Sequence, residues 1–221
     1  MKIYLIINIA TILFPLILSF ENKLKFYKRL PALIGSILIV STGYIWWDIF
    51  ATARTDWGFN SDYLLGLKIF NLPLEEVLFF ITVPYAFTFL YETLSYYITD
   101  KRISFRSSLL IILVLTFLVT AFLFHAQDYT FTVLLACALC LLVLFFLNND
   151  LLKSRNFWLF VVLSFLPFLV VNYILTSVPI VKYSPEAIWG IRFLTIPLED
   201  FFYHFSLTAF YLLFYTKFRK I

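Results

Sequence analysis

The chain has 221 residues, of which 62% are hydrophobic and only 14% are charged. Soluble domains average roughly half apolar and about a quarter charged residues, so this composition excludes an ordinary water-soluble domain. The formal net charge of +4 comes largely from basic residues in short segments between apolar runs. That arrangement fits the positive-inside rule of membrane proteins better than nucleic-acid binding.

Seven apolar runs follow one another along the sequence. A bilayer core about 30 Å thick needs roughly 20 apolar residues for each helix that crosses it. The runs do not alternate between apolar and polar residues, as strands of a membrane barrel would. We therefore predict an all-α membrane protein with about seven transmembrane helices. The predicted spans are 3–20, 30–51, 74–98, 108–126, 130–147, 157–178 and 198–217.

The first run follows Lys2 and could also be a signal peptide. No small-x-small cleavage site follows Phe20, so we expect this run to be the first helix. Twelve of the 17 Lys and Arg residues then fall on one side of the membrane, which should be the cytoplasmic side. These residues are Lys23, Lys25, Lys28, Arg29, Lys101, Arg102, Arg106, Lys153, Arg155, Lys217, Arg219 and Lys220. The N-terminus is expected outside and the C-terminus in the cytoplasm.

The sequence contains an internal repeat at a fixed offset of 124 positions. Residues 66–69 (GLKI) match 190–193 (GIRF), and residues 73–76 (PLEE) match 197–200 (PLED), without a gap. We expect a single membrane domain, 1–221, in which repeat one (1–98) and repeat two (127–221) are joined by a connector helix (99–126). Three helices plus one connector is an even number, so both repeats should enter the membrane in the same direction. A functional site is expected between them.

Two acidic pairs are the most informative polar residues of this apolar chain. Glu75 and Glu76, like Glu199 and Asp200, directly follow Pro-Leu at the start of a predicted helix. Both residue types suit a first helical turn, so simple helix capping is one interpretation. An ionisable residue at membrane depth is costly, however, and is by default a candidate for function.

A second polar element lies at the end of the second predicted span. Asp48 follows Trp46 and Trp47, which could belong to an aromatic belt at the membrane surface. Asp48 fits that interpretation poorly. If the second and third helices pack side by side, Asp48 should lie near Glu75 and Glu76.

These features resemble the integral-membrane lycopene cyclase domain family, whose repeats carry Pro-Leu-Glu-Glu type motifs. The resemblance rests on Trp47-Asp48, on residues 73–76, on Tyr91-Glu92, on the repeat and on the seven apolar runs. It covers nearly the whole chain, which looks like a fused form of the two-subunit bacterial cyclases. It implies a bacterial cytoplasmic membrane, a lipophilic carotenoid substrate and contact with other carotenoid pathway enzymes.

The implied reaction is the cyclisation of an acyclic carotenoid end group. A proton adds to the terminal double bond, a second double bond attacks the resulting cation, and loss of a proton completes the ring. There is no net redox change, so we expect neither a flavin nor a metal. The five glycines, at positions 35, 43, 58, 66 and 190, cannot form the dinucleotide fingerprint of flavin-dependent cyclases. Cys137 and Cys140 are expected to be packing residues.

The expected catalytic residues are Asp48, Glu75, Glu76, Glu199 and Asp200. Glu75 and Glu76 lie about 100° apart around a helix, so one should be the proton donor and the other its partner or the base. Asn172 and Asp200 stand where the first half has Asp48 and Glu76, which favours the first half as the main centre. His204, one helical turn after Asp200, could orient it or share a proton with it, and a polar packing role is an equal alternative. The expected substrate-binding residues are Trp46, Trp47, Phe79, Phe80, Asn172, Tyr203 and His204.

Other classes of membrane protein fit less well. The last span has no internal lysine for a retinal Schiff base, and Asp48, Asp56 and Asp62 are too widely spaced for a prenyltransferase diphosphate site. A small-molecule or ion transporter with repeated halves is the main alternative, because such folds also carry intramembrane acids. Matching Gly or Pro breaks are missing from its halves, since Pro84 corresponds to Thr208.

Overall fold

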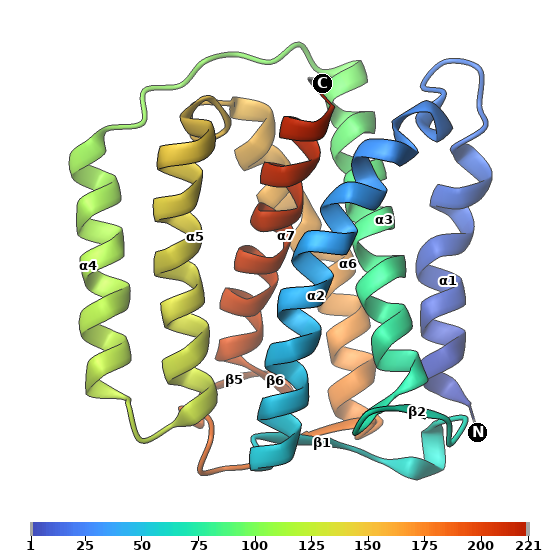
Figure 1. Ribbon diagram of the computed structural model, residues 1–221, viewed down its shortest axis with the longest axis vertical. Helices are drawn as coiled ribbons and strands as arrows, with labels where there is room; N and C mark the ends of the chain where they lie inside the picture. The colour runs from blue at the N-terminus through green and yellow to red at the C-terminus, as the bar shows by residue number, and fades with distance from the viewer. Residues whose placement is uncertain (1, 220–221) are drawn as a thin grey trace.

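The computed structural model describes residues 2–219, and most of these residues are helical (Figure 1). Every apolar run of the sequence contains one α-helix, and the helix ends lie within five residues of the predicted ones. The helices are α1 (Ile3–Leu18), α2 (Leu30–Arg54), α3 (Leu74–Tyr97), α4 (Ser107–Leu123), α5 (Asp128–Leu152), α6 (Arg155–Ser177) and α7 (Leu198–Phe218). Two short 3-10 helices, η1 (Phe26–Arg29) and η2 (Ser61–Tyr63), lie in the connections.

The helices differ in length and composition. Within residues 2–219, α3, α5, α6 and the segment Phe26–Arg54, which contains α2, are long and apolar enough to cross a membrane. The shorter helices α1 and α4 are apolar as well. Helix α7 has 21 residues and carries Glu199, Asp200 and His204 in its first two turns. The protein is therefore a mainly helical chain with at least four candidate membrane spans.

The starts of α3 and α7 have nearly the same backbone geometry. Pro73 and Pro197 precede the two helices with φ/ψ angles of −59°/146° and −60°/145°. Each proline also ends a tight hairpin. One hairpin pairs β2 (Lys68–Ile69) with β3 (Leu72–Pro73), and the other pairs β5 (Arg192–Phe193) with β6 (Ile196–Pro197).

The two hairpins match at the positions that turn the chain. Phe70 and Leu194 both have a φ of 56°, and Gly66 and Gly190 have φ values of 87° and 83°. A positive φ is easy for glycine but rare for Phe or Leu, so the shared geometry reflects a shared local fold. Both hairpins lie at the same end of the molecule, below the helix starts in Figure 1.

A third strand pair joins the two halves of the chain. Strand β1 (Trp57–Phe59) runs antiparallel to β4 (Val181–Tyr183), with Trp57 opposite Tyr183 and Gly58 opposite Lys182. This pair also lies at the hairpin end of the molecule (Figure 1). It therefore holds loops from distant parts of the sequence together over the starts of α3 and α7.

The helices pack in matching combinations. Helix α1 lies along α3, and α5 lies along α7; α2 contacts α7 and α3, and α6 contacts α3 and α7. Helix α4 packs on the outer side of α5 (Figure 1). The thiols of Cys137 and Cys140 are free and buried on α5, where they face backbone carbonyls of α7. The termini lie at opposite ends of the bundle.

Candidate functional site

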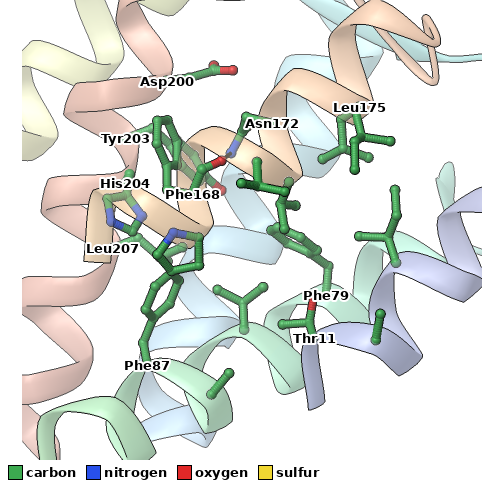
Figure 2. A pocket seen from close by; sticks show the side chains of 18 of the residues that line it. Thr11, Phe79, Phe87, Phe168, Asn172, Leu175, Asp200, Tyr203, His204 and Leu207 are labelled. Carbon is green, nitrogen blue, oxygen red and sulfur yellow. Dashed lines mark hydrogen bonds between the residues drawn. The ribbon is translucent and has the colours of Figure 1, made fainter. Parts of the chain in front are cut away.

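A cavity of about 690 Å³ opens between α1, α3 and α6. Its walls are mostly apolar, and polar groups gather at the end nearest the strands. Figure 2 shows Phe79 and Phe87 on α3, Thr11 on α1 and Asn172 on α6 around this space. Three carboxyl side chains reach it from three different helices: Asp48, Glu76 and Asp200.

Asp48 and Glu76 bring two carboxyl groups together. The phenol of Tyr4 donates a 2.5 Å hydrogen bond to Glu76 Oε2. Trp57 Nε1 and Thr52 Oγ1 donate to Asp48 Oδ1 at 2.7 and 3.3 Å. Asp48 Oδ2 is buried and accepts no hydrogen bond from an N–H or hydroxyl group of the described residues.

The carboxyls of Asp48 and Glu76 line the same end of the cavity, close enough for each to influence the protonation of the other. Two carboxylates cannot hydrogen-bond to each other, because both are acceptors. A proton on one of them turns the contact into a hydrogen bond and removes the repulsion between like charges. The geometry therefore suits a pair of carboxyls that share one proton, here called the carboxyl pair (Asp48 and Glu76).

Asp200 has a different environment, although it occupies the position that matches Glu76. Tyr129 donates to its Oδ1 at 2.7 Å, and Tyr183 donates to its Oδ2 at 2.9 Å. Burial, and then the nearby Asp200 carboxyl, raise the pKa of Tyr183 well above its usual value, so this phenol stays a donor. Both oxygens of Asp200 therefore accept a hydrogen bond from a tyrosine, whereas Oδ2 of Asp48 does not.

Glu75 and Glu199, the first acids of the two motifs, turn away from the cavity. The backbone N–H of Leu65 donates to Glu75 Oε1, and that of Trp189 donates to Glu199 Oε1, each at 2.5 Å. Both carboxyls are almost fully buried, at 0% and 1% exposure. They fasten the loops that lead into the hairpins, so the expectation that they carry catalysis gains no geometric support.

The aromatic residues expected at the site divide into two groups. Phe79 and Tyr203 line the cavity, and Trp47 packs against Tyr203 with ring centroids 5.1 Å apart. Trp46 instead is 54% exposed on the outer surface of α2. Phe80 is buried away from the cavity, where its carbonyl accepts a hydrogen bond from the hydroxyl of Ser41.

His204 and Asn172, which were both expected to bind substrate, line the cavity. His204 Nε2 forms a 2.8 Å hydrogen bond with Ser164 Oγ, and its ring packs on Phe168 at 4.5 Å. The expected contact with Asp200 is absent, because both oxygens of Asp200 already face tyrosines and the imidazole points to α6. Asn172 donates only to the carbonyl of Phe168, at 3.3 Å.

Four residues that hydrogen-bond to the acids of the site are not predicted from the sequence. They are Tyr4, Trp57, Tyr129 and Tyr183. Tyr4 and Tyr129 both lie in the first turns of their helices, but 125 positions apart, so a comparison at an offset of 124 does not align them. Trp57 and Tyr183 face each other across the β1–β4 pair. Strands β1 and β4 have three residues each and lie more than 100 positions apart, and no sequence pattern predicts that they pair.

Comparisons with known proteins bear on this geometry. The sequence matches the profile of a family described as lycopene cyclase over residues 1–94 and 128–218. Similar proteins include fungal proteins named "Bifunctional lycopene cyclase/phytoene synthase". The one from Arthroderma gypseum is 30% identical over 109 residues, which cover 48% of this chain and 17% of that protein.

Two further fungal proteins of that name give shorter matches. Identity is 34% over 74 residues for Leptosphaeria maculans, covering 34% of this chain and 12% of the relative. It is 36% over 86 residues for Pyrenophora tritici-repentis, covering 39% and 14%. These matches therefore span a minor part of each relative, and fungal relatives give no support to the expected bacterial origin. No solved structure matches the chain.

The family match covers most of the chain and leaves out the segment that contains α4. It includes all three acids that reach the cavity and the four aromatic residues that contact them. The chain belongs to the lycopene cyclase family.

Proposed function

We propose that this chain closes a ring on an end group of an acyclic carotenoid by a proton-initiated isomerisation. Membership of the lycopene cyclase family supports carotenoid cyclisation in general. One observation carries the mechanism: the carboxyl pair (Asp48 and Glu76) lies at the polar end of an otherwise apolar cavity. A hydrocarbon substrate has no polar group to bind. The shape of the cavity must therefore position the substrate, and the carboxyl pair must supply the proton that starts the reaction.

The first step is protonation of the terminal double bond. One carboxyl of the pair holds the shared proton and delivers it to carbon, which leaves a tertiary cation on the substrate. Tyr4 and Trp57 hydrogen-bond to the pair and stabilise the negative charge that this transfer creates. Electrostatic stabilisation of this kind is most effective when the donors are already fixed in place.

The second step forms the ring. The electrons of a nearby double bond attack the cation, a carbon–carbon bond forms, and the positive charge moves into the ring. Asp200 and the rings of Trp57, Tyr129 and Tyr203 line the polar end of the cavity. Each ring that faces a cation can contribute roughly 0.5–2 kcal/mol when water is excluded.

The last step removes a proton from the cyclic cation and forms the final double bond. The carboxyl pair, which lost its proton in the first step, can accept this one and return to its starting state. Electrons neither enter nor leave the substrate, so the proposal includes no flavin and no metal ion. The position of the base relative to the ring decides which proton is lost and therefore which ring type forms.

We extend the proposal to the arrangement in the membrane. All seven helices cross the bilayer, with the N-terminus and the strands outside and the C-terminus in the cytoplasm. Repeat one (1–98) and repeat two (127–221) have the same orientation, and α4 connects them. The matched hairpins and the antiparallel β1–β4 pair support this arrangement.

The proposed function also implies partners in the membrane. The substrate is a lipophilic carotenoid taken from the bilayer. The names of the fungal relatives combine a cyclase with a phytoene synthase, which supports contact with another enzyme of carotenoid synthesis. The transporter alternative has no comparable support, since the family match concerns a cyclase.

Neighbouring glutamates on α3 provide the test. Glu76→Gln and Glu75→Gln make the same chemical change one residue apart, and only Glu76 lines the cavity. Ring product from an acyclic carotenoid is measured per amount of inserted protein. Loss of a general acid costs at least about 10²-fold in rate, so Glu76→Gln should be nearly inactive. Glu75→Gln should stay close to the wild type, and equal loss in both variants would contradict the proposal.

A further inference from the structure

The cavity is long and has reactive groups at one end only. Its lining runs from Tyr4 to Leu18 along α1 and from Glu76 to Thr93 along α3. At 1.5 Å per residue, these stretches correspond to about 21 and about 25 Å. All the lining carboxyls, namely Asp48, Glu76 and Asp200, lie at the Tyr4 end.

The wall beyond the acids offers no charged group to a polar substrate end. Toward Leu18 and Thr93, the lining consists mainly of aliphatic and phenyl side chains from α1 and α3, whereas the lining residues of α6 (167–175) lie nearer the acids. Thr93 and Thr11 carry the polar atoms of this part, and neither side chain is charged. A hydrocarbon chain fits such a wall, and its far end would meet only apolar surface.

One side of the cavity faces outward between α1 and α6. Phe14 on α1 and Val170 on α6 line the cavity, yet they are 70% and 62% exposed. Ala10 and Leu18 on α1 combine lining and exposure in the same way. At membrane depth, this exposure is to lipid. The acid end is covered instead by the buried rings of Trp57 and Tyr129.

We propose that the gap between α1 and α6 is a lateral opening through which a linear carotenoid moves from the bilayer into the cavity. This inference rests on the proposed function and adds the route and the orientation of the substrate. One end group reaches the carboxyl pair, while the rest of the polyene passes the opening and lies along α1 and α3 toward Leu18 and Thr93.

Two consequences follow from this orientation. An extended carotenoid is about as long as the bilayer core is thick, roughly 30 Å, which exceeds the length of the cavity. One end group is therefore closed in each binding event, and the substrate must leave and turn round before the other end can react. The distal end group is not recognised, so a carotenoid with one end already cyclised is still a substrate at its open end.

Blocking the opening tests the route. Val170→Trp places a large ring at the opening, and Val162→Trp makes the same change on the same helix at an exposed residue that does not line the cavity. We expect kcat/KM for a linear carotenoid to fall at least tenfold in Val170→Trp and to stay within twofold in Val162→Trp. Ala10→Phe on the opposite wall should repeat the loss, and it serves as the second variant if Val170→Trp inserts poorly.

The substrate panel tests the orientation. Wild-type protein receives an acyclic carotenoid, a monocyclic one and one with a hydroxyl group at the distal end. We expect similar rates per open end group, and released monocyclic product that exchanges with added labelled monocyclic carotenoid. Equal activity of Val170→Trp and Val162→Trp, or closure of both ends without exchange, would overturn the inference. Absence of ring product from the wild type with any substrate would instead refute the proposed function.

Discussion

The two halves of the molecule use the same framework, but only one side of it is open. Helix α6 meets α3 beside the cavity, and at an offset of 124 positions the matching contact is that of α2 with α7. On the cavity side, Phe168 and Phe87 line open space. Their counterparts on the other side, Tyr44 and Tyr211, are buried in a packed cluster.

Hydrogen bonds tighten the packed side. Tyr44 donates to Ser206 Oγ at 2.8 Å, and the hydroxyls of Tyr211 and Ser41 lie 2.7 Å apart. A phenol adds one polar atom to a phenyl ring, and when buried it needs a partner that draws the helices together. Phenyl rings at the matching positions make no such demand. Hydrogen-bonded tyrosines thus pack the contact between α2 and α7 closely, whereas phenyl rings at the matching positions of α6 and α3 line the cavity.

The largest effect is expected at Asp48, whose matching position in the second repeat is Asn172. Asp48→Asn removes the carboxyl that faces Glu76, so the shared proton is lost and the rate should fall about 10²-fold. Asn172→Asp in the same protein should not restore activity, because Asn172 contacts the Phe168 carbonyl and lies on α6. Ring product per inserted protein measures both variants. Restored turnover in the double variant would mean that the two positions are interchangeable.

A smaller effect on rate is expected when the tyrosines that donate hydrogen bonds to Glu76 and Asp200 are replaced by phenylalanine. Tyr4→Phe removes the hydrogen bond to Glu76, and a loss of about 1.4 kcal/mol in the transition state lowers kcat about tenfold. Tyr129→Phe should lower kcat only about threefold, because Asp200 keeps the hydrogen bond from Tyr183. Steady-state kinetics of the two variants gives the ratio. A larger loss in Tyr129→Phe would move the main proton chemistry to Asp200.

The helices of this fold could be predicted from sequence because each one lies in an apolar run, and four of the described helical segments are long enough to cross a membrane. Composition along the chain sets where such a helix begins and ends, and the prolines before α3 and α7 fix two of the starts. Three of the four motif acids, Glu75, Glu199 and Asp200, are buried, and Glu76 is half-buried beside the cavity. The sequence does not distinguish Glu75 from Glu76, because both stand in the first turn of α3.

The direction in which each acid points depends on tertiary contacts. Glu75 is held by a backbone N–H ten residues earlier, and Glu76 by a tyrosine on α1. Neither contact leaves a periodic pattern in the sequence. The cavity could not be predicted from the sequence either, because it depends on the size and polarity of side chains that face each other on different helices. His204 was assigned to Asp200 from helical spacing, but its partner Ser164 lies on α6.

The smallest expected effect on rate comes from the pair that the comparison treats as equal, Glu75 and Glu199. Each accepts a backbone N–H through Oε1, and each has a buried Oε2 that accepts no hydrogen bond from the described residues. In Glu75→Gln and Glu199→Gln, the amide oxygen can still accept the backbone N–H. The amide nitrogen then replaces a buried oxygen that has no hydrogen-bond partner, and a buried donor that stays unpaired costs about 1–3 kcal/mol. We therefore expect nearly unchanged turnover and a lower thermal midpoint in detergent, by a similar amount in both variants. Glu199 Oε1 also accepts a hydrogen bond from Thr130, so Thr130→Val in the Glu199→Gln background removes a side-chain contact that is not matched at Glu75 among the described residues. If one glutamate variant loses turnover while its midpoint is unchanged, that glutamate takes part in the chemistry, and the two loop anchors are not equivalent.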